Sequence, residues 1–371
     1  MTYRVIRYTA IALILALGIG YLSFWPVPIA PVAWEPPEDP GFTGVFAENS
    51  RLEGMEVLAL NPDEHGPEDI AVDGDGTVWP ASAEGGLDRM EQGGDLVHVG
   101  HLGNRPLGLD PAADGGLYIA DSFVGLLHWS LEGGTRVLVD EVRGQPLRYA
   151  NQLAVASDGR VFFSVSTTRF DPQAYGGTLE ASILDLLEHR QTGYVAVYTP
   201  EGEVEVIAEG FSFTNGVALT PAEDALLIAE TATYAIWKHW LEGPKAGTRE
   251  KIVETLPGFP DNIQAQGDGT FWVGLVSPRP PAPDMLAPFP AVRRLVMRLP
   301  ESVRPAPIPY AALVRIDGEG TILDVPQDPS GVFALTTGAR IVGDHLIISS
   351  LGARGLGRLP IAALDGGCGR L

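Results

Sequence analysis

The chain has 371 residues, a single cysteine (Cys368) and a formal net charge of −22. One cysteine excludes a disulfide framework within the chain. The acidic balance argues against nucleic acid as a partner, because nucleic-acid binding depends on Lys and Arg neutralising phosphates. The length, with 31 Pro, 45 Gly and few long helical periods, favours one large all-β domain behind an N-terminal appendage.

The N-terminal segment differs in kind from the rest of the chain. Arg4 and Arg7 precede 18 uncharged residues, Tyr8–Trp25, and this length is close to the minimum that crosses a bilayer. The preceding arginines favour a cytoplasmic N-terminus, with the rest of the chain on the extracytoplasmic side. We therefore predict a cytoplasmic stub, an uncleaved anchor and the start of a linker in 1–34, and the rest of this Pro-rich linker in 35–44. A cleaved signal peptide that releases a secreted protein is the alternative.

A short phrase recurs through the rest of the chain. Each copy has a polar or small residue, a few apolar residues, an Asp/Gly turn and a second apolar run. The copies are GPEDIAVDGDGTVW (66–79), RPLGLDPAADGGLYIAD (105–121), NQLAVASDGRVFFSV (151–165), NGVALTPAEDALLIAE (215–230) and DNIQAQGDGTFWVG (261–274). A strand, an Asp-Gly turn and a second strand form a β-hairpin. Repeats of roughly 40–50 residues with several strands each predict a β-propeller.

The repeats predict an all-β, six-bladed propeller over 45–371. The expected blades are about 66–104, 105–147, 148–211, 212–257, 258–329 and one that begins near 332. We expect the strand-like Met55–Leu60 to complete the last blade and close the ring.

Two of these blades are too long, and each carries an insertion. The first insertion, about 169–191, contains SILDLLEHR, in which Ile183, Leu186 and Leu187 fit one face of a short helix. The second insertion, about 278–309, is Pro-rich and contains DMLAPFPAVRRLVMRL. We predict that both are helical lids over one mouth of the central channel, since long insertions in compact folds are often functional. Packing on the side of the ring is the alternative.

One position of the repeat carries oxygen-bearing side chains. Eleven residues before Trp79, Tyr118, Phe162, Leu226 and Trp272, the chain has Glu68, Leu107, Asn151, Asn215 and Asp261. The innermost strand of every blade lines the propeller axis, so these positions should converge there. With Asn262, the set offers two carboxylates and three amides, which suit a hard cation and favour calcium over magnesium. The plainer interpretation is that each Asn caps a turn.

Several longer motifs resemble a known family. RPLGL, LYIAD and GLL (105–127), FTNGVAL (213–219), LLIAETATYAIWKHWLEGPKAGT (226–248), PGFPDNI (257–263) and FWVGLVSPR (271–279) occur in order. They are similar to the strictosidine synthase-like family, and within it to the adipocyte plasma membrane-associated protein group, whose members have an N-terminal membrane anchor. The resemblance covers about 45–366. The wider superfamily includes paraoxonases and gluconolactonases, which are calcium-bearing six-bladed propellers.

The resemblance to paraoxonases implies a ligand set for the catalytic calcium, which corresponds here to Glu68, Asn151, Asn215, Asp261 and Asn262. A second, structural calcium would use Asp69 and an Asp where this chain has Gln152. That change loses a charge and argues against a second ion.

The family resemblance also bears on the general base. Paraoxonases place a His beside the metal where this chain has Leu107, so a histidine base is not supported. His128, His239 and His345 lie elsewhere in their repeats and are expected to be structural. The catalytic Glu of true strictosidine synthases has no counterpart that can be identified, which argues against condensation of an amine with an aldehyde.

Two functions of different classes follow. The first is a calcium-dependent hydrolase of small apolar lactones or aryl esters, with Asp261 or Glu68 as the general base for water. The second is a non-enzymatic, membrane-anchored propeller that binds a partner or a lipid and keeps calcium for structure. They differ in whether the ion has an open coordination position beneath the lids.

The second insertion also carries a membrane-binding pattern. Its apolar residues recur at helical spacing, and they are Met285, Leu286, Phe289, Val292, Leu295, Val296 and Leu299. Arg293, Arg294 and Arg298 add positive charge, and an apolar face beside a basic one is typical of a helix at a membrane surface. This predicts membrane contact through 284–299 in addition to 8–25. The alternative is a helix packed on the ring, with its arginines paired to acidic neighbours.

Overall fold

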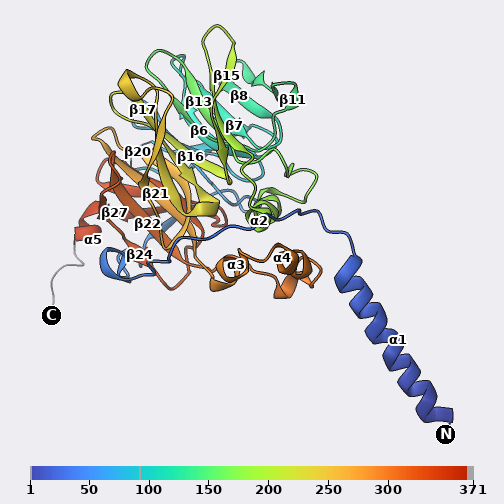
Figure 1. The fold of residues 1–371 in the computed structure, drawn as a ribbon. Helices are drawn as coiled ribbons and strands as arrows, with labels where there is room; N and C mark the ends of the chain where they lie inside the picture. The colour runs from blue at the N-terminus through green and yellow to red at the C-terminus, as the bar shows by residue number, and fades with distance from the viewer. Residues whose placement is uncertain (1, 92, 366–371) are drawn as a thin grey trace.

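The computed structural model describes residues 2–91 and 93–365. Cys368 lies outside these residues. The N-terminal helix α1 (Thr2–Phe24) extends away from a compact β-domain, as Figure 1 shows. It is apolar and long enough to cross a membrane.

The β-domain is a propeller. Its innermost strands are neighbours in chain order, and the last of them lies beside the first, so the ring closes. These strands are β2 (Ile70–Val72), β6 (Pro106–Pro111), β12 (Ala150–Val155), β16 (Thr214–Leu219), β20 (Gly258–Ala265) and β25 (Thr336–Val342). The apolar core lies between adjacent sheets. One cluster, for example, joins Leu227 and Ile236 to Val273 and Val314 of the next sheet.

Three sheets have four antiparallel strands from consecutive segments. The sheet of 105–147 contains β6, β7 (Leu117–Asp121), β8 (Gly125–Ser130) and β9 (Gly134–Val139), and a short pair, β10 (Glu141–Val142) and β11 (Gln145–Pro146), follows it. The next contains β12, β13 (Val161–Val165), β14 (Gly193–Tyr198) and β15 (Val204–Phe211). The third contains β16, β17 (Ala225–Glu230), β18 (Ala235–Trp240) and β19 (Arg249–Val253).

The last two sheets complete the ring. One contains β20, β21 (Thr270–Pro278), β22 (Ala311–Asp317), β23 (Ile322–Asp324) and β24 (Gln327–Asp328). The other contains β25, β26 (His345–Ser350), β27 (Gly355–Pro360) and the N-terminal β1 (Glu56–Ala59), and the helix α5 (Ile361–Asp365) follows β27. The pairing of β1 with β27 confirms the prediction that an N-terminal strand completes the last blade.

The prediction of six blades was wrong. The described residues form five sheets of four or five strands, and 66–104 form two separate pairs instead. The pairs are β2 with β3 (Val78–Pro80), and β4 (Gly86–Arg89) with β5 (Val97–His101). Only the isolated bridges Val78–Met90 and Ala81–Leu87 join β3 to β4. Val78 and Met90 form a hydrogen-bonded pair, and in a regular antiparallel ladder the next such pair would include residue 80. That residue is Pro80, which has no backbone N–H to donate.

Both insertions contain helices at the same end of the propeller (Figure 1). The helix α2 (Thr178–Glu188) lies in the first insertion, and α3 (Pro281–Leu286) and α4 (Pro290–Val296) lie in the second. Short 3-10 turns occur at Gly44–Phe46, Thr231–Thr233, Gly243–Lys245 and Glu301–Val303.

Residues 26–40, called the tether here, connect α1 to the propeller without a helix or strand. The tether is not a free spacer. Its backbone bonds to both insertions, because Val32 N–H donates to Glu188 O at 3.0 Å and Trp34 N–H donates to Ala287 O at 3.3 Å. Ile29 is buried among apolar residues of the first insertion and the inner ring.

Candidate functional site

The inner strands present their polar residues at irregular points in the ladders. The register shifts between Ala150 and Leu153, between Thr214 and Val217, and between Pro260 and Ile263. A β-bulge of this kind redirects side chains and frees them from the regular alternation. The register shifts contain four of the predicted ligand residues, Asn151, Asn215, Asp261 and Asn262. The same kind of local irregularity therefore sets the direction of all four side chains. Glu68 lies just before β2.

Hydrogen bonds link four of the five predicted ligand residues, and the fifth, Asn151, lines the same cavity. Asn215 Nδ2 donates to Asp261 Oδ2 at 3.0 Å, and Asn262 Nδ2 donates to the backbone oxygen of Glu68 at 2.8 Å. Asn151 lines the same cavity as Glu68, Asn215 and Asp261. All five residues are buried. Leu107, at the same position of the repeat, is buried in an apolar cluster.

Each of the three amides has its nitrogen bonded and its oxygen free. Asn151 Nδ2 donates to Ser166 Oγ at 3.0 Å, in addition to the two bonds above. The Oδ1 atoms of Asn151, Asn215 and Asn262 are buried without a hydrogen-bond partner among the described residues. A buried polar atom without a partner carries a desolvation cost. Three such oxygens beside two carboxylates fit a hard cation bound by oxygen ligands.

The two carboxylates differ in their partners. Asp261 accepts hydrogen bonds on both oxygens, from Asn215 Nδ2 and from the backbone N–H of Asn262 at 3.1 Å. Glu68 accepts on Oε2 from Arg105 Nη2 at 2.7 Å in a buried ion pair. Among the described residues, Arg105 is the side chain that donates to the Glu68 carboxylate.

Burial disfavours the charged forms of both groups. It raises the pKa of Glu68 to about 7, although Arg105 lowers it. Burial, and then the Glu68 carboxylate, hold the pKa of Asp261 well above its usual value. A bound cation would relieve this cost by favouring ionisation of both groups.

Asp69 and Gln152, the residues that correspond to the second ion's ligands in the paraoxonase resemblance, are hydrogen-bonded within the protein. Gln152 Oε1 accepts from the backbone N–H groups of Val217 at 2.9 Å and Ile263 at 3.0 Å. Asp69 accepts from Leu109 N–H at 3.0 Å and from the Gln264 side-chain amide. The amides of Gln152 and Gln264 thus take part in hydrogen bonds at these positions.

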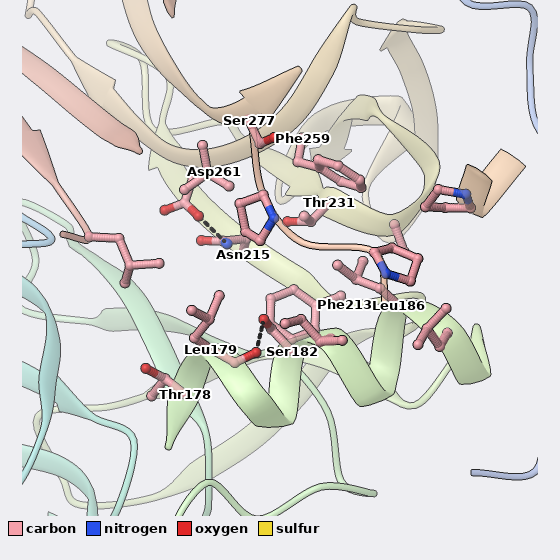
Figure 2. A pocket seen from close by; sticks show the side chains of 18 of the residues that line it. Thr178, Leu179, Ser182, Leu186, Phe213, Asn215, Thr231, Phe259, Asp261 and Ser277 are labelled. Atoms are coloured by element: carbon pink, nitrogen blue, oxygen red, sulfur yellow. Dashed lines mark hydrogen bonds between the residues drawn. The ribbon is translucent and has the colours of Figure 1, made fainter. Parts of the chain in front are cut away.

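An apolar cavity of about 1070 Å³, including its open mouth, lies above this cluster. Glu68, Asn151, Asn215 and Asp261 form part of its lining, and Figure 2 shows the Asn215–Asp261 bond facing helix α2. The apolar walls come from both insertions and from inner-strand ends, and they include Leu179, Ile183, Leu186, Phe213, Phe259 and Pro307. The three histidines that were expected to be structural are not among the described residues that line the cavity. They are His128, His239 and His345.

The tether forms part of the same cavity. Trp34 lines it and stacks on His189, with ring centroids 3.8 Å apart and an interplanar angle of 9°. Arg293 of α4 also lines it and donates to the backbone oxygens of Leu187, Ala287 and Val32. This guanidinium therefore joins both insertions to the tether.

Sequence reasoning missed Arg105, Trp34 and Arg293 as parts of the site. Arg105 is the first residue of its repeat copy, 105–121. Its place just before the expected inner strand was the sequence signal that could have assigned it to the site. Trp34 and Arg293 belong to irregular or inserted segments, whose sequences carry no repeat to place them.

The comparisons with known proteins agree on the family. A model of the strictosidine synthase-like N-terminal region matches 44–90, and one of strictosidine synthase matches 151–244. Adipocyte plasma membrane-associated protein from Bos taurus is 30% identical over 96% of this chain and 92% of its own length. The chain belongs to the strictosidine synthase-like family. The strictosidine synthase-like 13 protein of Arabidopsis thaliana is 36% identical over 62% of this chain, which spans only 57% of that relative.

Solved structures establish the fold of this strictosidine synthase-like protein. A gluconolactonase from Xanthomonas campestris matches with a TM-score of 0.59 and 17% identity, over 84% of this chain and 91% of that one. A calcium-binding regucalcin from Agrobacterium tumefaciens matches with a TM-score of 0.56 and 14% identity, over 82% and 93%. At these identities the likeness concerns the propeller fold alone.

A second group of side chains in this family member could hold a metal ion. Ligand atoms of Glu64, Asp88 and His98 lie within 4.8 Å of one another beside β4 and β5. His98 Nδ1 is 2.9 Å from Asp88 Oδ1. These residues are not among those that line the apolar cavity.

The helix α2 of the first insertion carries a buried acid that should make stability depend on pH. Burial is the largest cause that raises the pKa of Asp185, and Glu188 also raises it, whereas Thr167 and Arg169 lower it; together they place this pKa at about 7. The folded state then binds more protons than the unfolded state between about pH 4 and pH 7, so the free energy of unfolding falls as pH rises through this range. Asp185→Asn should remove this penalty and stabilise the protein at pH 8 by on the order of a few kcal/mol, with little effect at pH 4.

Denaturant unfolding of the full chain in detergent at several pH values measures this difference. Asp63→Asn, at an exposed position, is the control and should change nothing. A difference between variant and wild type that is the same at pH 4 and pH 8 would contradict the assignment.

Proposed function

We propose that the protein is a calcium-dependent hydrolase of small apolar lactones or aryl esters. The observation that supports this most is the set of three buried, unpaired Asn oxygens beside Glu68 and Asp261 at one end of an apolar cavity. Glu68, Asn151, Asn215, Asp261 and Asn262 would hold the ion. Bound there, calcium would polarise a substrate carbonyl and stabilise negative charge on its oxygen.

The remaining chemistry belongs to residues of the chain. The apolar walls would bind the acyl or aryl part of the substrate and exclude bulk water from the reacting bond. A carboxylate, Glu68 or Asp261, would take a proton from a water molecule as its oxygen attacks the carbonyl carbon. The C–O bond to the alcohol or phenol then breaks, and the proton passes to the leaving oxygen. Arg105 would hold Glu68 in place through Oε2.

The ion pair of Arg105 with Glu68 favours a second candidate. The guanidinium already neutralises the charge of the Glu68 carboxylate. Part of the negative charge of the cluster is therefore compensated within the protein, whether or not the cluster catalyses a reaction. In this candidate the propeller keeps calcium for structure and uses the cavity to bind an apolar partner or lipid without hydrolysis.

A chelation experiment separates the two candidates. The full chain, purified in detergent, is tested against alkyl-substituted lactones and aryl acetates, first as isolated, then after treatment with EGTA, and then after calcium is returned. We expect hydrolysis that EGTA abolishes and calcium restores. Tight calcium binding without hydrolysis above the rate of heat-denatured protein would favour the binding function. Hydrolysis unaffected by EGTA would contradict the calcium-dependent mechanism.

We also propose that the propeller lies on the extracytoplasmic side of a membrane. The apolar helix α1 and the arginines that precede its uncharged run support this arrangement. Calcium at extracytoplasmic concentrations would then be available to the site.

A further inference from the structure

The second insertion exposes large apolar side chains. Met285, Phe289, Val292 and Leu295 are 66%, 55%, 40% and 40% exposed, and they are called the apolar face here. Ala287, Arg293 and Met297 of the same insertion are buried. The insertion therefore has one side that packs on the protein and one side that is apolar without a covering element among the described residues.

The basic pattern of this segment differs from the sequence prediction. Arg293 does not face outward, because its guanidinium binds backbone oxygens of the tether and of both insertions. Arg294 is exposed beside the apolar face. Residues 285–300 contain no Asp or Glu, although the chain as a whole has a net charge of −22. Residues 285–300 therefore carry a net positive charge, from their arginines alone.

The insertion lies next to the end of the membrane-spanning candidate. Arg298 Nε donates to Trp25 O at 2.6 Å, directly after α1. Figure 1 shows α3 and α4 at the end of the propeller from which α1 departs. A bilayer that contains α1 would therefore have its surface close to the second insertion.

We propose that the apolar face lies in the interfacial layer of the same bilayer that holds α1. Continuity with α1 supports a membrane as the occupant, rather than a soluble partner. The absence of acidic residues and the exposed Arg294 suit an anionic lipid surface, where apolar side chains enter the headgroup boundary and basic groups contact phosphates. The docking does not depend on the proposed hydrolase activity.

Membrane docking would position the cavity as well. Pro283, Pro305 and Pro307 of the same insertion line the cavity. The same insertion therefore contributes both the apolar face and part of the cavity wall.

A depth measurement on the full chain tests the proposal. The single native cysteine is removed by Cys368→Ser, and Phe289→Cys or Met285→Cys is introduced and labelled with a small fluorophore. Leu131→Cys is the control, since Leu131 is 79% exposed and lies in the turn between β8 and β9. Figure 1 places β8 at the opposite end of the propeller from α3 and α4. The protein is placed in nanodiscs of phosphatidylcholine and phosphatidylglycerol.

We expect lipids with a nitroxide on the upper acyl chain to quench the labels at 289 and 285 severalfold more than the label at 131. Aqueous iodide should show the reverse order. Quenching by iodide at all three positions would overturn the proposal. Labels at 289 and 285 that resist both quenchers would also overturn it, because a second copy of the chain, rather than lipid, would then cover the apolar face. Using two positions guards against a local disturbance at either one.

Discussion

Asp261→Asn is expected to weaken calcium binding by on the order of a hundredfold, because affinity follows the number of charged ligands. Hydrolysis should fall by about two orders of magnitude or more, since the substitution removes both a ligand charge and a candidate base. The amide has nearly the same shape and still offers an oxygen acceptor, so the fold should survive. Titration calorimetry with calcium on the chelator-treated chain measures the first effect, and lactone or ester hydrolysis measures the second.

Asp268→Asn is the matched control for this experiment. Asp268 lies in the turn between β20 and β21, on the same hairpin, and its side chain is exposed. Calcium affinity and activity should both be unchanged there. An Asp261→Asn protein that binds calcium as tightly as wild type would refute the assignment of Asp261 as a ligand.

Arg293→Met is expected to release the tether and loosen both insertions. The buried guanidinium donates to oxygens of Leu187, Val32 and Ala287, and each buried carbonyl that loses its donor costs on the order of 1–3 kcal/mol. The loss falls on contacts between the insertions and the tether, so it should appear as local opening before global unfolding. Hydrogen exchange should speed up over 26–40, in α2 and in α3.

Arg294→Met is the control, because Arg294 is the exposed neighbour on the same helix. It should leave exchange in these segments unchanged. Exchange in the Arg293→Met protein that accelerates equally across all sheets would indicate global destabilisation instead, and it would contradict a local role in holding the insertions and the tether together.

The recurring sequence phrase predicted the propeller and much of its polar cluster. The repeat places one residue of each copy at the same point of the inner strand, so Glu68, Asn151, Asn215 and Asp261 could be grouped without a structure. The orientation of their amides could not be predicted, because each depends on a specific partner in the folded ring, such as Ser166 for Asn151 and Asp261 for Asn215.

The failures have local physical causes. Pro80 interrupts the ladder between β3 and β4, an effect that the hydrophobic pattern does not reveal. The burial of Arg293 depends on backbone oxygens from three separate segments, and helical periodicity alone placed it on the outer face. The tether has a composition typical of a spacer, yet packing on both insertions gives it a fixed course.

The course of the tether affects how the propeller can be separated from its anchor. A protease usually binds its substrate as an extended strand, and it needs free backbone N–H and C=O groups on both sides of the cut. In the tether, the backbone groups of Ala30, Val32, Trp34 and Pro37 are already bonded to the insertions. Separating the folded propeller from α1 with these bonds intact would therefore require a cut before Ile29, next to α1, and the released protein would keep Trp34 in its cavity. A recombinant form that begins at the first propeller strand would lack that wall.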